Sequence, residues 1–207
     1  ESVQFTVGEM QAAVCEADMA GKYVLAHCHT SPSVKNALAA GVRSIEHGSI
    51  LDEETAKGIV EHGAFMVPTL LVMDVLAKSA EAGDIPHYAQ MKLRQVHTQM
   101  SVSVDLAAQA GVALGSGTDI LGARQSGRGA ELSLKARVIG PMNAILSATS
   151  TNARLFRMED RIGRVEEGME ADLIGIAGDP LGDINVLADD GNVRLVVKGG
   201  QVVKETI

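Results

Sequence analysis

Aromatic side chains and long apolar runs are scarce in this chain of 207 residues. Phe, Trp and Tyr make up 2% of the sequence, so there are no aromatic platforms on which nucleobases could stack. No apolar stretch approaches the roughly 20 residues that a membrane-spanning helix needs. The 18 basic residues are scattered and outnumbered by 26 acidic ones, which gives a net charge of −8. The sequence therefore predicts neither a nucleic acid nor a membrane as a partner.

Cysteine is also rare. Cys15 and Cys28 are the only two, and they form no recognisable pattern, so we interpret them as free thiols in a reducing cytoplasm. Cys28 lies between two histidines, and a role as a metal ligand is the less favoured alternative. The sequence begins at Glu1 with no signal sequence, and its first segment is typical of the middle of a domain. We therefore expect a fragment of a longer protein.

Short apolar strands alternate with helices along most of the chain, which is typical of a parallel α/β fold. With 46% hydrophobic residues, the chain is long enough for one sizeable core. Thr6 and Glu9 have the spacing of a capping box, and Asp52 is a good N-cap. In chain order, we expect helix 7–20, strand 23–27, helix 31–41, strand 42–47, helix 52–63, strand 65–68, helix 86–110, strand 112–115, helices 130–139 and 141–148, and a capped turn at 149–151.

The composition changes from Arg157 onward, where glycines separate short β-rich runs. Gly199-Gly200 is typical of a two-residue hairpin turn. The expected strands are 171–176, 193–198 and 201–204. The sequence therefore predicts two domains, residues 1–156 and a smaller all-β element at 157–207.

Three residues that can serve a metal site fall at the predicted ends of strands: His27, His47 and Asp119. In a parallel barrel, functional groups come from the carboxyl ends of the strands. Two imidazoles can bind zinc and leave positions open for water and substrate, and a bound metal lowers the pKa of water toward 7. A neighbouring carboxylate can take the proton of that water and pass it to a leaving amine. We therefore predict His27 and His47 as metal ligands and Asp119 as the functional carboxylate.

Other polar residues near these positions are weaker candidates for a functional role. His29 lies two residues beyond His27, on the same side of an extended strand, where it could contact substrate, orient the water or be a plain loop residue. Glu46 should point to the opposite face from His47 and form a structural contact. We expect structural or solvent-facing roles for the remaining histidines, His62, His87 and His97.

These segments resemble the second half of a metal-dependent amidohydrolase, in the branch that contains Xaa-Pro dipeptidases, lysine/arginine carboxypeptidases and ochratoxin-type amidases. The resemblance covers nearly the whole chain. It implies an α/β fold, in which residues 1–156 form strands five to eight of a TIM-like (β/α)8 barrel and residues 157–207 form the C-terminal strands of a small β-sandwich. The matching motifs, in order, are Ile45–Gly48, Val67–Leu70, Gly117–Asp119, Gly163–Asp172 and Gly178–Leu181.

The resemblance also implies the chemistry of the complete enzyme. His27 on strand five and His47 on strand six would bind one zinc ion, and Asp119 on strand eight would be the proton shuttle and a ligand of a second zinc ion. His29 is an additional candidate catalytic residue. The implied substrate is a small peptide or an N-acyl amino acid, with homo-oligomerisation left open.

Two features of the family have no counterpart here: the His-x-His pair of strand one and the carboxylated lysine of strand four. We therefore expect the fragment alone to be inactive. Many relatives also carry a histidine shortly after the strand-eight aspartate, whereas residues 122–129 contain none. Arg124 or Arg128 could meet a substrate carboxylate instead, although a solvated loop arginine is the favoured interpretation.

The sequence leaves two alternative functions open. Many related deaminases place a glutamate three residues after the strand-five histidine, and Thr30 at that position counts against a deaminase. A catalytically inactive scaffold is the second alternative, and the presence of His27, His47 and Asp119 together counts against it.

Overall fold

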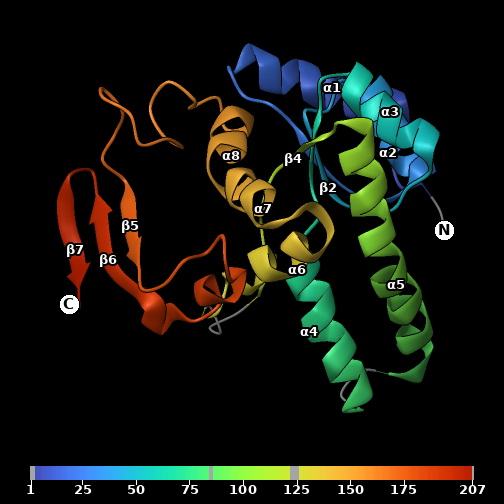
Figure 1. Cartoon of the computed structure of the whole chain (residues 1–207). Coiled ribbons are helices and arrows are strands. Elements are labelled where there is room, and N and C mark those ends of the chain that lie inside the picture. Colours follow the sequence, from blue (N-terminus) through green and yellow to red (C-terminus); the bar gives the residue numbers. More distant parts are fainter. Residues whose placement is uncertain (1–2, 84–85, 122–125, 207) are drawn as a thin grey trace. The chain divides into compact units, whose positions relative to one another are not determined.

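The computed structural model of the chain describes residues 3–83, 86–121 and 126–206 (Figure 1). By their internal contacts, these residues divide into two units, Glu1–Leu114 and Gly115–Ile207, each of which is described by itself.

The first unit alternates helix and strand, as the sequence predicts. Its four strands form one parallel sheet in chain order: β1 (Leu25–Thr30), β2 (Ser44–Ile50), β3 (Phe65–Val67) and β4 (Ala113–Leu114). Its helices are α1 (Val7–Met19), α2 (Ser31–Ala39), α3 (Glu53–Glu61), α4 (Leu70–Glu81) and α5 (His87–Ala110). Because every connection between neighbouring strands contains at least one helix, all pairs can run parallel.

The core of the first unit lies between the central strands and three of the helices. Ile45 of β2 and Met66 of β3 are fully buried. Val34, Ile59 and Val104 bury their side chains from α2, α3 and α5, respectively. This packing explains why β2 is buried along most of its length and why all three residues of β3 are apolar and buried.

The helix caps follow the sequence signals. Glu9 N donates to Thr6 Oγ1 at 3.3 Å and Thr6 N donates to the Glu9 carboxylate at 2.8 Å, which confirms the capping box at the start of α1. Asp52 accepts a hydrogen bond from Thr55 N at 2.7 Å and caps α3.

Some boundaries differ from the prediction. β1 and β2 each begin two residues later than expected and run three residues further, because parallel pairing continues as far as Thr30 and Ile50 across an irregularity in the register. Helix α4 was not predicted, since Thr69 before it gives no side-chain cap and has a left-handed backbone with φ +51°. The turn predicted at 149–151 is instead the start of a short helix, α8.

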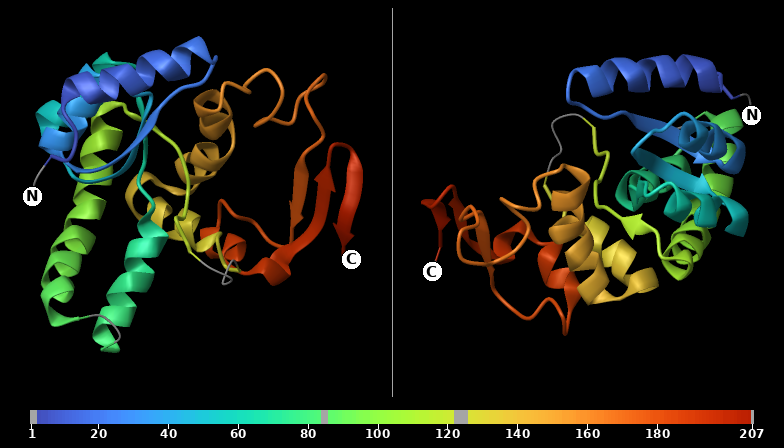
Figure 2. Two further views of the ribbon diagram at one scale, coloured as in Figure 1. Left: turned by 180° about the vertical axis from the view of Figure 1, so that it is seen from behind. Right: turned by 90° about the horizontal axis from the view of Figure 1, so that it is seen from above.

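The second unit contains three helices followed by an antiparallel sheet. The helices are α6 (Ala130–Ile139), α7 (Pro141–Ala148) and α8 (Ser150–Leu155). The sheet has the order β5 (Leu173–Ile176), β6 (Val193–Lys198), β7 (Gln201–Glu205), and the 3-10 turns η1 (Ile184–Leu187) and η2 (Asp190–Asn192) precede β6 (Figure 2). Gly199 and Gly200 join β6 to β7 with positive φ, which confirms the predicted hairpin.

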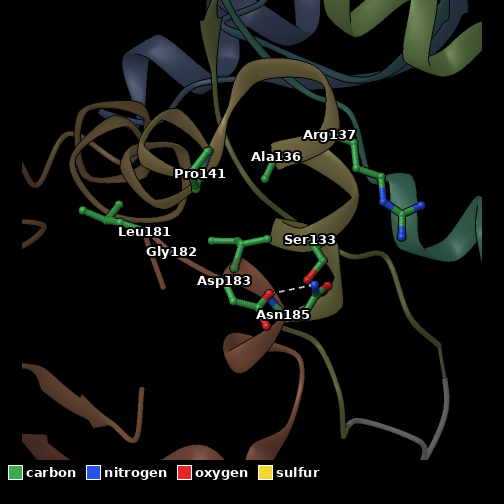
Figure 3. Close-up of a pocket in the computed structure, with 9 residues that line it drawn as sticks. Ser133, Ala136, Arg137, Pro141, Leu181, Gly182, Asp183 and Asn185 are labelled. Atoms are coloured by element: carbon green, nitrogen blue, oxygen red, sulfur yellow. Dashed lines mark hydrogen bonds between the residues drawn. The ribbon is translucent and has the colours of Figure 1, made fainter. Parts of the chain in front are cut away.

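A cavity of about 290 Å³ lies between α6 and the segment around η1 (Figure 3). Ser133 of α6 and residues 181–185 contribute to its wall. Within the described part of the chain, the buried Ser133 hydroxyl has no hydrogen-bond partner. The cavity contains none of the predicted site residues.

The structure thus confirms a mixed α/β fold with a parallel sheet and a separate antiparallel sheet. The division into units falls at residue 114, whereas the domain boundary at 156/157 stays a prediction. Among the helices of the described residues, none is both long enough and apolar enough to span a membrane.

Candidate metal centre

Three histidine rings meet on the neighbouring strands β1 and β2. His27 and His29 are alternate residues of β1 and their ring centroids are 4.7 Å apart, which confirms that they share one face of the strand. The ring of His47 from β2 lies 4.4 Å from that of His27 and 4.8 Å from that of His29. One nitrogen from each ring lies within 4.8 Å of the other two, so these residues form a cluster that could hold a metal ion.

The shortest contact in the cluster joins Nδ1 of His27 to Nε2 of His47, at 2.8 Å. Two imidazole nitrogens that share one zinc ion, each about 2.0–2.1 Å from it, lie roughly 3.3 Å apart in a tetrahedral site. A small rotation of either ring therefore makes room for an ion between them. The donor set fits zinc, for which neutral imidazole is a good ligand.

The backbone at His47 is strained in a way that sets the direction of its side chain. His47 has φ +76° and Gly48 has φ +54°. Left-handed backbone is rare for a non-glycine residue and costs about 1–3 kcal/mol, so it persists where its surroundings hold it and is found most often at functional sites. Gly48 cannot be replaced easily, because a Cβ there would lie 2.9 Å from Met66 Sδ.

Two hydroxyl groups orient the rings of the cluster. Nδ1 of His47 is hydrogen-bonded to Thr69 Oγ1 at 2.7 Å, and Nδ1 of His29 to Ser49 Oγ at 2.9 Å. Thr69 is buried, so the first bond is shielded from water. A partner on the second ring nitrogen fixes the tautomer and orientation of a metal-binding histidine.

Helix α5 supports the end of β2 next to this cluster. The hydroxyl of Ser103 donates to Ser49 O at 2.9 Å and accepts from Leu51 N at 3.0 Å. Ser103 is 1% exposed, so it satisfies two backbone groups where water does not reach. The position of Ser49, and through it that of His29, therefore depends on α5.

Burial keeps His47 uncharged. Desolvation lowers the pKa of His47 to about 4, and the nearby His29 and His27 act in the same direction. At neutral pH the ring is therefore in the form that binds a metal ion, without first having to lose a proton.

Asp119 belongs to the second unit and is described there. It is exposed, follows the run Gly115–Thr118 beyond β4, and has φ +54°. The structure brings His27, His29 and His47 together, whereas the convergence of Asp119 with them stays a prediction.

The weaker candidates have structural surroundings. The Glu46 carboxylate accepts a hydrogen bond from Ser44 Oγ at 2.5 Å, as expected for a partnered group. The Cys28 thiol donates to Ser33 O at 3.7 Å, and burial raises its pKa, which suits a buried thiol. His62 lies at the C-cap of α3, where its Nδ1 is 2.8 Å from Gly58 O.

Four further residues gain no functional support. His97 lies 3.9 Å from Asp74 and is partly exposed. Arg128 is exposed, and its contact with substrate stays a prediction. Arg124 and the side chain of His87 lie outside the described residues.

The sequence did not predict that Thr69 and Ser49 would support the cluster. The signal for Thr69 was its place directly after Val67-Pro68 at the end of a strand, within a motif already noted. Ser49 gave no comparable signal, because serine two residues after a strand histidine is common in turns and caps.

Known proteins resemble this chain along nearly its whole length. Residues 1–203 match the amidohydrolase family. The chain belongs to this family. Ochratoxinase from Aspergillus niger is 30% identical over 203 residues, which are 97% of this chain and 42% of ochratoxinase. Its crystal structure matches with a TM-score of 0.87.

Solved structures of two peptidases are also similar to this chain. A prolidase in complex with N-methylphosphonate-L-proline is 37% identical, with a TM-score of 0.93 over 100% of this chain and 52% of the prolidase. A Xaa-Pro dipeptidase with methionine bound in its active site is 35% identical, with a TM-score of 0.90 over 97% of this chain and 49% of the dipeptidase. The chain thus spans about half the length of these relatives.

The bond between Thr69 and His47 predicts a role for Thr69 in metal affinity. Thr69→Val keeps the shape of the side chain and removes the hydroxyl that holds Nδ1 of His47. We expect the affinity for zinc to fall 10–100-fold, the usual loss when such a supporting partner is removed. Competition with a chelator measures this affinity. The control is Thr55→Val, which changes another buried threonine of the same unit. An unchanged affinity in Thr69→Val would contradict the assignment.

The lowered pKa of His47 predicts how the stability of the metal-free protein changes with pH. The unfolded chain takes up a proton here near pH 6.5, whereas the folded unit does so only near pH 4. The unfolded state binds more protons between these values, so the free energy of unfolding falls as the pH is lowered from 6.5 to 4, by at most about 3 kcal/mol. Urea titrations should show that the free energy of unfolding falls less between pH 7 and pH 4.5 in His47→Gln than in the wild type. The same fall in both proteins would contradict this prediction.

Proposed function

We propose that this chain supplies part of the active site of a metal-dependent hydrolase that cleaves an amide bond in a dipeptide or an N-acyl amino acid. The observation that carries the proposal is the contact of His27 Nδ1 with His47 Nε2, 2.8 Å apart, on the parallel sheet of an amidohydrolase family member. The similarity to a prolidase, a Xaa-Pro dipeptidase and ochratoxinase supports a small peptide or N-acyl amino acid as substrate.

The proposed architecture of the complete protein is a barrel with an attached β-sandwich. Residues 1–156 would form strands five to eight of a TIM-like barrel, and residues 157–207 the last strands of the sandwich. Two observations support this: the chain order of the parallel strands β1 to β4, and the coverage of about half of each relative.

The proposed roles follow from the chemistry of each side chain. His27 and His47 would hold the ion through their ring nitrogens. A zinc ion held there would lower the pKa of a coordinated water and polarise the carbonyl that is attacked. Asp119 would accept the proton of the attacking water and return it to the leaving amine. It would also be a ligand of a second zinc ion. His29, held by Ser49, orients the water or contacts the substrate.

The location in the cytoplasm is part of the same proposal. Cys15 and Cys28 are both free thiols, as is usual in a reducing compartment.

The role of Asp119 predicts a large kinetic effect for Asp119→Asn in the complete enzyme. The amide cannot take a proton from the attacking water, and general acid–base groups contribute typically about 10²–10⁴-fold. We expect kcat to fall by this factor while metal content changes less. The control is Asp105→Asn, an exposed carboxylate of α5. Turnover near the wild-type value in Asp119→Asn would place proton transfer elsewhere.

The substrate class is tested by a screen of the complete enzyme with dipeptides, N-acyl amino acids and aminopurines. We expect hydrolysis of a peptide or N-acyl amino acid, and no turnover by residues 1–207 alone, because the sequence has no counterpart of the strand-one histidines. Ammonia release from aminopurines without peptide cleavage would favour a deaminase. Thr30 offers no carboxylate for that chemistry and instead hydrogen-bonds with Ser33 at the start of α2.

A further inference from the structure

A buried lysine contacts the backbone at the start of the segment that leads to Asp119. Lys135 of α6 is 0% exposed. Its Nζ donates to Gly115 O at 2.7 Å and to Ser147 Oγ at 3.2 Å, and lies 3.9 Å from the Glu131 carboxylate. The carbonyl of Gly115 is thus held by a charged donor, which forms a stronger hydrogen bond than a neutral one.

Burial of this ammonium group is energetically unfavourable, because it removes the charge from water. Desolvation lowers the pKa of Lys135 to about 8, although Glu131 opposes the shift. An apolar side chain of similar volume is often as stabilising as a buried ion pair, or more so. Packing alone therefore does not explain a lysine at this position, whereas a function in holding the carbonyl of Gly115 does.

An asparagine holds the next residue of the chain from a different helix. Asn152 of α8 accepts from Ser116 N at 3.0 Å and donates to Ser116 O at 2.9 Å. Its amide thus pairs with both backbone groups of Ser116, as a neighbouring strand would. Together with Lys135, it fixes three backbone groups of Gly115 and Ser116.

Only Gly117 and Thr118 separate this fixed point from Asp119. Asp119 has a left-handed backbone, φ +54°, and Thr118 Oγ1 accepts from Ile120 N at 3.3 Å in a local turn. A strained residue keeps such a conformation only where the surrounding structure over-determines it. The fixed backbone at Gly115 and Ser116 provides that constraint on the N-terminal side of Asp119.

We propose that Lys135 and Asn152 are positioning residues, which clamp Gly115 and Ser116 and thereby set the carboxylate of Asp119 for proton transfer. The inference rests on the proposed function of Asp119. Displacing a reacting group by about 1 Å can cost 10²-fold in rate, so a loosened clamp should lower kcat with little effect on substrate binding.

The test uses the complete, metal-loaded enzyme and the variants Asn152→Leu and Lys135→Met. Asn152→Leu removes both bonds to Ser116 at nearly constant volume. We expect kcat to fall 10–100-fold in each variant, with KM and metal content within about twofold of wild type. Leu155→Val, a buried core change in the same helix α8, is the control for lost stability, and it should leave kcat unchanged even if the melting temperature falls.

A double-mutant cycle with Asp119→Asn separates positioning from general damage. If the clamp acts through Asp119, then adding Asn152→Leu to Asp119→Asn lowers the residual kcat by less than twofold. An equal 10–100-fold loss in both backgrounds overturns the inference and leaves the role of Asp119 standing, as does an unchanged kcat in Asn152→Leu. Near wild-type turnover in Asp119→Asn alone overturns the proposed function and the inference with it.

Discussion

The contact between His27 Nδ1 and His47 Nε2 is the interaction on which the functional account depends. It places two imidazole nitrogens from neighbouring parallel strands 2.8 Å apart, so that a small rotation of either ring makes room for a metal ion between them. In the register of the two strands His47 lies beside Cys28, so an extended backbone would point its ring to the face opposite that of His27. The left-handed backbone of His47 instead brings its ring to within 4.4 Å of the His27 ring.

The pair is held by features with a cost to stability. His47 has a left-handed backbone beside Gly48, and its ring is buried against Thr69, which is itself left-handed at φ +51°. Such strain persists only where the surrounding structure holds it, and the neighbouring Ile45 and Met66 are fully buried. The same pattern recurs in the second unit, where the left-handed Asp119 follows a backbone held by Lys135 and Asn152. His47 and Asp119 thus share a left-handed backbone next to hydrogen-bonded residues.

Much of this arrangement could be predicted from the sequence. Apolar runs that end in His27 and His47 indicated both the strands and the candidate ligands, and the two-residue spacing of His27 and His29 gave their common face. The left-handed φ of His47 could not be predicted, because a histidine within a strand ordinarily has an extended backbone. Helix α4 was not predicted, and in the structure Thr69 before it binds His47 in place of capping the helix. Lys135 was overlooked because a lysine in an amphipathic helix is usually exposed.

X-ray absorption spectroscopy of the complete, zinc-loaded protein tests the central claim most directly. The account predicts stoichiometric zinc with imidazole nitrogens at about 2.0–2.1 Å. The imidazole contribution should decrease in His27→Ala and in His47→Ala, and stay unchanged in His62→Ala, whose ring lies at the end of α3. A zinc environment that is the same in all four proteins, or protein that does not retain zinc, would contradict the account.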